Sequence, residues 1–324
     1  MSNTRISIVL VACSLGLPAG CMQPPDLSKV RQSERQSVHR FDNFLSVASN
    51  PQVAVAGTDA GVIVSSADRG KNWVRHPLGA LSSIISIASC PDGSFAALDY
   101  HSKVWTSAPD GRRWESRALE KDFSPSAIAC APDGRLWVVG SYSTVASSID
   151  HGKTWTRTSL DEDMILTTVQ FIDAHTGFVS GEFGTFAHTS DAGVTWTREA
   201  PLPDELYPFS AYFFNADVGV INGSDGTSLQ TWDAGKTWQQ LRNPARARLY
   251  ALTFADHTLV GVGAGGVVAK LCGFEWTPLP ISSDRRTDLL AAVPAQSGSI
   301  LSVGPGGTLL PVDLNPPLEV TASW

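Results

Sequence analysis

The stretch TWDAGKTW, residues 231–238, recurs along the chain, and this recurrence decides the fold. Three further good copies are SADRGKNW (66–73), SIDHGKTW (148–155) and TSDAGVTW (189–196). All four follow the Asp-box pattern S/T-x-D-x-G-x-x-W. Two other copies are degenerate: the aspartate before Trp114 is shifted by one place to Asp110, and only Gly273 survives before Trp276. A motif repeated in this way predicts a repeat architecture.

The tryptophans that close these six copies are regularly spaced, at intervals of 41, 41, 41, 42 and 38 residues. They are Trp73, Trp114, Trp155, Trp196, Trp238 and Trp276. In the four good copies the aspartate is positioned to bind backbone N–H groups and fold a turn. The glycine allows the chain to reverse, and the indole covers the turn. We therefore expect Asp68, Asp150, Asp191 and Asp233 to be structural residues and not catalytic ones.

The sequence between the tryptophans predicts four short strands in each unit. In the first unit, strands are expected at 44–48, 53–56 and 62–65, followed by the Asp-box and a strand that begins at the tryptophan. Four strands in about 41 residues, without helical periodicity, are typical of a propeller blade. Residues 45–324 hold about seven such units, so we predict an all-β, seven-bladed propeller with four-stranded antiparallel blades; six blades is the alternative. Either residues 318–322 or residues 37–40 would supply the last strand of the seventh blade.

Composition and charge limit the classes of function. Hydrophobic residues make up 43% of the chain and charged residues 17%, as in globular proteins. The formal net charge of -7 argues against nucleic acid as the main partner. Cys90, Cys130 and Cys272 are expected to be buried, with at most one disulfide, and neither a metal centre nor a cofactor site is expected.

The N-terminal residues are typical of a bacterial export signal. Arg5 precedes an apolar run, and Ala19-Gly20-Cys21 resembles a lipobox. We expect a signal peptide over 1–20, a lipidated flexible tether over 21–40 and a single propeller domain over 41–324, monomeric on the periplasmic side of a bacterial membrane. Export as a soluble periplasmic or secreted protein is the alternative. No run of 18 or more apolar residues follows this segment.

One face of the predicted ring carries candidate binding residues. In a four-stranded blade, the turns between the second and third strands share a face with the linkers between blades, and the Asp-boxes lie on the other face. The first of these faces is predicted to present Tyr100, Tyr142 and Phe183, which lie 14, 13 and 13 residues before their tryptophans. Exposed aromatic side chains favour contact with proteins. Packing of these rings against neighbouring loops is the alternative.

Charge is distributed unevenly over the same linkers. The linkers that leave blades two, three and four carry nine acidic residues, namely Glu115, Glu120, Asp122, Asp161, Glu162, Asp163, Glu199, Asp204 and Glu205. The same linkers carry four basic residues, Arg117, Lys121, Arg157 and Arg198. The next two linkers carry Arg242, Arg246 and Arg248, and then Arg285 and Arg286. Ordinary solvated linker charges are the alternative interpretation.

Over about residues 40–311 the chain resembles the photosystem II stability/assembly factor family. GEFGT (181–185) with SDAGVTW (190–196) carries this resemblance. It implies a seven-bladed propeller that binds protein partners, since family members in oxygenic phototrophs bind nascent reaction-centre protein. The family uses a basic patch for this purpose, and Arg246, Arg248 and Arg286 are the residues here that most resemble it.

The alternative is an exported propeller that binds glycans or acts as a glycoside hydrolase or sialidase, because sialidases and other glycoside hydrolases also contain Asp-boxes. A glycosidase needs two carboxylates that face each other across a cleft. Glu182 and Asp225, or Asp59, could provide them from separate blades. The sequence has no Phe/Tyr-Arg-Ile-Pro segment near its N-terminus, and its arginines are grouped in late linkers. We therefore predict a non-enzymatic, envelope-anchored scaffold or assembly factor that binds membrane or envelope proteins.

Overall fold

A computed structural model of the chain describes residue 28 and residues 36–79, 81–119, 123–281, 286–295 and 298–315. The chain divides into two units, Met1–Gln36 and Ser37–Trp324. The second unit therefore begins before residue 41, the expected start of the propeller. Cys21, the predicted lipidation site, and the predicted signal peptide lie outside the described residues.

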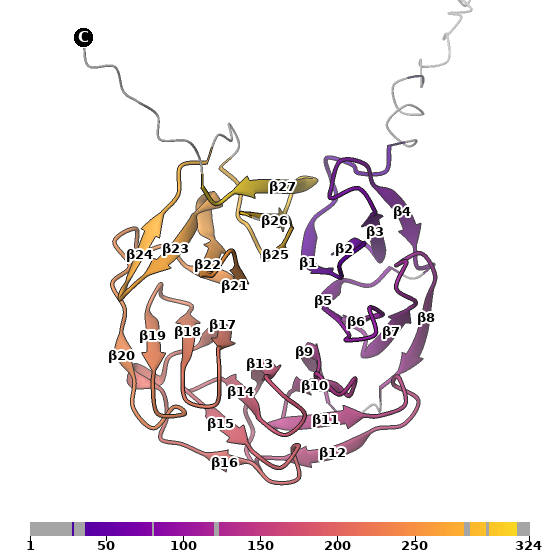
Figure 1. The fold of residues 1–324 in the computed structure, drawn as a ribbon. Helices are drawn as coiled ribbons and strands as arrows, with labels where there is room; N and C mark the ends of the chain where they lie inside the picture. Colours follow the sequence, from indigo (N-terminus) through magenta and orange to yellow (C-terminus); the bar gives the residue numbers. More distant parts are fainter. Residues whose placement is uncertain are drawn as a thin grey trace, which may run out of the picture. The chain divides into compact units, whose positions relative to one another are not determined.

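The repeat folds into seven antiparallel sheets arranged in a ring (Figure 1). The first four blades contain β1 (Phe44–Ser49), β2 (Ala54–Thr58), β3 (Val62–Ser66), β4 (Val74–Pro77); β5 (Ile84–Ser89), β6 (Phe95–Asp99), β7 (Lys103–Ser107), β8 (Trp114–Ala118); β9 (Pro125–Cys130), β10 (Leu136–Gly140), β11 (Thr144–Ser148), β12 (Thr156–Ser159); and β13 (Leu166–Phe171), β14 (Gly177–Gly181), β15 (Phe186–Thr189), β16 (Thr197–Arg198). The other three contain β17 (Pro208–Phe213), β18 (Gly219–Gly223), β19 (Ser228–Thr231), β20 (Gln239–Gln240); β21 (Leu249–Ala255), β22 (Thr258–Gly263), β23 (Val268–Cys272), β24 (Glu275–Pro278); and β25 (Ala291–Pro294), β26 (Ser299–Gly304), β27 (Thr308–Asp313).

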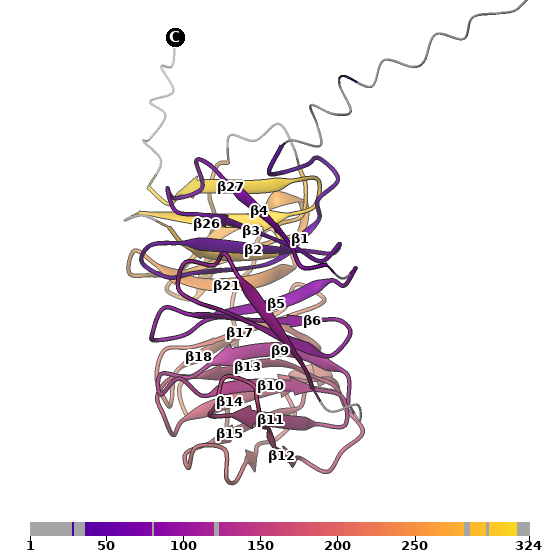
Figure 2. The same cartoon turned by 90° about the vertical axis from the view of Figure 1, so that its right-hand side faces the viewer.

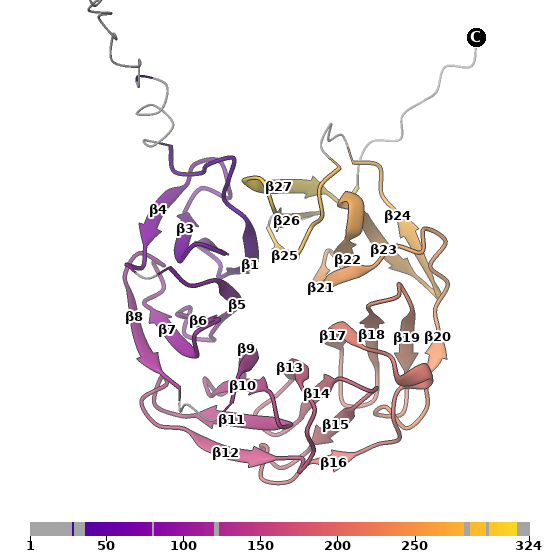
Figure 3. The same ribbon diagram turned by 180° about the vertical axis from the view of Figure 1, so that it is seen from behind.

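Each blade is a simple meander whose first strand lies nearest the axis of the ring. The inner strands β1, β5, β9, β13, β17, β21 and β25 surround the centre in both axial views (Figures 1 and 3). The edge-on view shows the blades following one another around the ring (Figure 2). Short 3-10 turns, η1 (Pro203–Glu205) and η2 (Ala264–Gly266), are the helical elements within the described part of residues 36–315. The predicted seven-bladed, all-β propeller is confirmed.

The last strand of the seventh blade was predicted to come from one of two segments, and the structure excludes one of them. The seventh blade has three strands among the described residues, β25 to β27. Residues 37–40, one candidate for its fourth strand, form no strand, and residues 318–322, the other candidate, lie outside the described residues. The Asp42 carboxylate instead accepts hydrogen bonds from Arg75 at 2.8 and 3.0 Å and from the His39 N–H at 2.7 Å. The Gly307 N–H of blade seven donates to the Asp42 carbonyl at 2.7 Å, which ties the two ends of the ring together.

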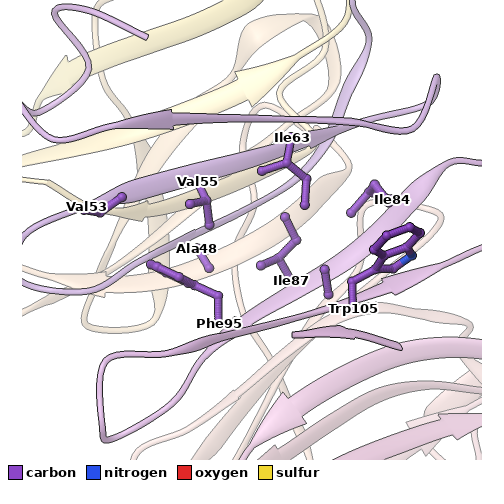
Figure 4. Close-up of a cluster of buried hydrophobic side chains, with 9 residues drawn as sticks. Ala48, Val53, Val55, Ile63, Ile84, Ile87, Phe95 and Trp105 are labelled. Carbon is purple, nitrogen blue, oxygen red and sulfur yellow. The ribbon is translucent and has the colours of Figure 1, made fainter. Parts of the chain in front are cut away.

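The core consists of seven apolar clusters, one at each interface between neighbouring blades. Figure 4 shows the cluster between blades one and two, in which Val55 and Ile63 pack against Ile84, Phe95 and Trp105. The six predicted tryptophans each pack in the cluster between their own blade and the preceding one. The interface between blades six and seven contains no tryptophan in its cluster. The spacing of the tryptophans along the sequence therefore matches the spacing of the packed interfaces from one blade to the next.

The four predicted aspartate turns have the hydrogen bonds expected of them. In the fourth blade, Asp191 accepts from the Thr195 N–H at 2.9 Å and from the Thr195 hydroxyl at 2.6 Å. The Thr189 hydroxyl donates to Asp191 at 2.7 Å and accepts from the Gly193 N–H at 3.0 Å. Asp68, Asp150 and Asp233 repeat this arrangement. At Gly193, which has φ +75°, a Cβ would lie 2.2 Å from Trp137 of the preceding blade, so the turn requires glycine.

The two degenerate copies differ from this geometry. Asp110 accepts only from the Arg112 N–H at 3.1 Å among the described contacts, although the Trp114 indole still donates to the Gly111 carbonyl at 3.0 Å. Trp276 is not in an aspartate turn: it lies within β24, paired with Leu271, and is buried. Its assignment to an Asp-box in the sequence is therefore corrected to a core position.

Acid should weaken the propeller through these turns. Hydrogen bonds from Thr195 and Thr189 lower the pKa of Asp191 from 3.8 to about 2, and those from Asn72 and Ser66 lower that of Asp68 to about 2. A carboxylate with a depressed native pKa stabilises the fold fully above its unfolded pKa and loses this effect as pH falls through the native pKa. We expect the melting temperature to fall between about pH 4 and about pH 2. Asp191→Asn should melt lower at pH 7 and fall less steeply over that range in thermal unfolding; an unchanged slope would contradict the assignment.

Candidate partner-binding surface

The two faces of the ring are built from different connections. The turns from second to third strands and the linkers between blades form one face, which we call the linker face. The turns from first to second strands and the aspartate turns form the other, the aspartate-turn face. Because the interfaces beneath are closely packed, side chains on the linker face are held by a rigid scaffold, the usual setting for binding residues.

The three predicted aromatic residues lie on the linker face and are exposed. Tyr100, Tyr142 and Phe183 are 71, 57 and 58% exposed, so their rings do not fold back into neighbouring loops. Tyr142 and Phe183 occupy the same left-handed turn position, with φ values of 57° and 54°. Tyr100 lies one position earlier in its turn, directly after β6, where the Asp99 carboxylate accepts hydrogen bonds from the His101 and Lys103 N–H groups. Tyr142 and Phe183 therefore occupy equivalent positions in their blades, and Tyr100 is displaced by one residue.

The three predicted arginines are also exposed on this face. Arg246 and Arg248 lie in the linker from blade five to blade six, and the Arg248 carbonyl accepts from the Ala264 N–H at 2.9 Å. Arg286 lies in the next linker, where it helps to line a pocket of about 500 Å³ with Leu279, Ile281 and Leu310. Arg285 lies outside the described residues.

The Asp225 carboxylate interacts with the positive charge of Arg248 on the linker face. Burial acts to raise its pKa, but hydrogen bonds from Thr227 and the positive charge of Arg248 offset that effect and leave the pKa below its ordinary value. Asp225 therefore stays ionised at neutral pH. It neutralises part of the positive charge beside Arg248.

The predicted acidic residues differ in their surroundings. Glu162 is paired with Arg198, Glu199 lies 3.0 Å from His188, and Glu115 lies 3.7 Å from Arg117. Asp161, Asp163, Asp204 and Glu205 are exposed. Glu120, Lys121 and Asp122 lie outside the described residues. Exposed negative charge is thus concentrated on the linkers that leave blades three and four.

A second group of aromatic side chains on this face was missed by the sequence analysis. The Tyr207 and Phe209 rings meet edge-to-face with centroids 5.9 Å apart, and the Phe209 and Tyr250 rings meet with centroids 5.5 Å apart. We call Tyr207, Phe209 and Tyr250 the aromatic ladder. Tyr207 precedes β17, Phe209 lies on β17 and Tyr250 lies on β21, so the ladder joins blades five and six near the axis. The signal for the aromatic ladder in the sequence was the presence of aromatic residues at the starts of β17 and β21.

The carboxylates considered for a glycosidase are each held by their own surroundings. Glu182 accepts from the Ile165 N–H at 2.9 Å, Asp59 from the Asn43 amide at 2.7 Å, and Asp225 from the Thr227 hydroxyl at 2.8 Å. No group of three or more His, Cys, Asp or Glu side chains in the described ranges could hold a metal ion.

The cysteines form the one disulfide that the sequence analysis allowed, but they are not buried as expected: Cys90 and Cys130 are partly buried and Cys272 is exposed. Cys90 and Cys130 form a disulfide with Cα atoms 5.2 Å apart, between the inner-strand ends of blades two and three. Cys272 is exposed and is the free cysteine of the described part of the chain.

Comparison with known proteins supports the sequence resemblance. Residues 151–248 match a family model described as "Photosynthesis system II assembly factor YCF48". Over these residues the chain is similar to the photosystem II assembly factors. No curated protein matches the sequence.

Solved structures similar to this propeller include two assembly factors and an enzyme. YCF48 from Cyanidioschyzon merolae has a TM-score of 0.68 and 12% identity, over 85% of this chain and 96% of its own. YCF48 bound to D1 peptide has a TM-score of 0.70 and 12% identity, over 86 and 93%. Virginiamycin B lyase from Staphylococcus aureus has a TM-score of 0.73 and 13% identity, over 85 and 96%. At these identities the likeness establishes the fold alone.

None of the helical segments within the described residues is long and apolar enough to cross a bilayer.

Proposed function

We propose that this assembly-factor-like propeller is a non-enzymatic scaffold that binds partner proteins through its linker face, during assembly or maintenance of a membrane complex. The observation that supports this best is the exposure of Tyr142 and Phe183, together with Arg246, Arg248 and Arg286, on one face of a rigid ring. Aromatic and arginine side chains are the types that dominate protein–protein binding energies. The D1 peptide bound by a structurally similar YCF48 is consistent with a polypeptide partner.

We further propose that the chain is exported and anchored by lipidation at Cys21, so that the propeller works beside the membrane. This anchoring rests on the sequence pattern Ala19-Gly20-Cys21. Cys21→Ser should move the protein from the membrane fraction to the soluble periplasmic fraction. Retention of the variant in the membrane fraction would contradict lipid anchoring at this residue.

Charge reversal tests the docking surface. The partner is first identified by crosslinking the native protein in cells, followed by mass spectrometry. Arg246→Glu/Arg248→Glu/Arg286→Glu should then slow association with that partner by about tenfold or more, with a larger effect at low salt than at high salt, because complementary charge acts mainly on the encounter rate. Surface plasmon resonance measures both rates.

A matched variant controls for the change in net charge. Arg69, Arg112 and Arg113 are exposed on the aspartate-turn face, so their triple reversal to Glu removes the same charge from the opposite side. This control should associate at nearly the wild-type rate. Equal association by both triple variants would reject the linker face as the docking surface. Cleavage of a glycan panel, or opening of a streptogramin ring, by the purified protein would contradict the non-enzymatic assignment.

A further inference from the structure

The aromatic ladder has an acidic end. Burial raises the Tyr207 pKa, and the negative charge of the nearby Glu182 carboxylate raises it further. Asp204 and Glu205 are exposed in η1, immediately before the ladder. The Leu202 N–H of the same linker donates to the Gly184 carbonyl at 2.8 Å, which fixes η1 beside the turn that carries Phe183. Three carboxylates therefore lie around Tyr207 and the exposed Phe183 ring.

The opposite end of the ladder is basic. Tyr250 follows Arg248 by two residues at the start of β21, and Arg246 lies in the same linker. The Asn243 side chain donates to the Gly226 and Ala247 carbonyls at 2.9 Å, so this linker is held against the turn of blade five. Asp225 balances one of these two positive charges. The ladder thus runs from negative charge over blade four to positive charge at blade six.

We propose, on the basis of the proposed function, that the aromatic ladder binds an extended partner segment of mixed charge. The segment places bulky apolar side chains on Phe209 and its neighbours, a basic residue near Glu182, Asp204 and Glu205, and an acidic residue near Arg246 and Arg248. The Tyr207 and Phe209 side chains are 36 and 37% exposed, and Tyr250 is partly buried. Exposed aromatic rings offer a large contact area with little loss of side-chain entropy. The charges at each end set the direction of the segment and exclude partners of uniform charge.

The two opposite charges favour a polypeptide over other ligands. An anionic lipid surface presents net negative charge, so it would be repelled at the acidic end of the ladder. A neutral glycan would leave both ends without a counter-charge. A polypeptide segment that carries both signs satisfies both ends at once.

Synthetic peptides test this proposal with the full chain. Fluorescence anisotropy is measured with labelled KKSFAFSDD, with the single-sign peptides KKSFAFSKK and DDSFAFSDD, and with KKSGAGSDD, which lacks the aromatic residues. The mixed-charge aromatic peptide should bind at least about tenfold more tightly than any of the others at low salt. Phe209→Ser should weaken this binding by about tenfold, whereas Phe274→Ser, an exposed ring on the aspartate-turn face, should change it by less than about twofold.

Charge reversal at exposed residues provides a second test that does not depend on the core. Asp204→Lys/Glu205→Lys should shift the preference from the mixed-charge peptide to the all-acidic peptide, and thermal unfolding should confirm that both residues can be changed without loss of fold. If the all-acidic peptide binds the wild type as tightly as the mixed one, and only reversal of the arginines weakens it, the ladder proposal fails and the proposed function stands. Failure of every peptide to bind below about 1 mM also overturns it. The association rate of the Arg246/Arg248/Arg286 triple variant with the partner identified by crosslinking tests the proposed function separately.

Discussion

Trp276→Ala should lower the free energy of unfolding by about 3–5 kcal/mol, the range expected when a buried tryptophan is truncated. The Trp276 side chain is 1% exposed and packs with Val220, Leu241 and Leu249 between blades five and six. Its indole N–H donates to the Ser228 hydroxyl at 2.8 Å, and that hydroxyl donates to Asn222 at 2.5 Å. The substitution therefore creates a cavity and also removes a buried hydrogen-bond partner. Urea unfolding followed by tryptophan fluorescence and by circular dichroism measures the change.

Trp232→Ala provides the matched control for this prediction. Trp232 is exposed on the aspartate-turn face and contacts Phe274, with centroids 5.7 Å apart. Its removal should cost less than about 1 kcal/mol, as for most surface substitutions. A loss at Trp276 no larger than the loss at Trp232 would show that the indole is not a structural element of the interface.

Loss of the Cys90–Cys130 disulfide should destabilise the propeller by about 2–4 kcal/mol. The bond closes a loop with a sequence separation of 40 residues, so breaking it gives the unfolded chain more freedom. The melting temperature of Cys90→Ser/Cys130→Ser should fall by roughly 5–15 °C, given about 2–4 °C per kcal/mol for a chain of this size class. Calorimetry under oxidising conditions measures the fall.

Reducing conditions and the free cysteine supply the controls. A reductant should lower the melting temperature of the wild type toward that of the double variant, and it should leave the double variant unchanged. Cys272→Ser should have little effect, because Cys272 is exposed and outside the disulfide. A wild-type melting temperature that does not respond to complete reduction would contradict a stabilising role for this bond.

The number of blades could be predicted because residues that pack between blades recur at nearly constant intervals along the sequence. Each interface needs a large apolar side chain at an equivalent place, and six of the seven interfaces use a tryptophan, so the tryptophan spacing reports the blade length. The seventh blade has no such residue, and its closure depends on contacts between distant residues such as Asp42 and Gly307. The sequence also contained a signal for the disulfide. Cys90 and Cys130 are 40 residues apart, which is nearly the length of one blade, so they occupy equivalent places in neighbouring blades.

The candidate surface could be predicted only where a residue belongs to the repeat. Tyr142 and Phe183 lie at one repeated turn position, so their exposure on the linker face follows from the topology. The aromatic ladder depends on the distance between β17 and β21 and on the direction of three side chains, which the spacing of residues along the chain does not determine. The shift of Tyr100 by one position, in contrast, is visible in the sequence, since Tyr100 lies 14 residues before its tryptophan and the other two rings lie 13 residues before theirs.

Site-specific photocrosslinking tests the central claim most directly. A photoreactive phenylalanine analogue is placed in living cells at Tyr142 or Phe183 on the linker face, and at Phe274 or Trp232 on the aspartate-turn face; all four native side chains are exposed. We predict that Tyr142 and Phe183 yield a covalent adduct with a discrete protein partner, and that Phe274 and Trp232 do not. Adducts formed only from the aspartate-turn face would contradict the assignment of the linker face as the binding surface.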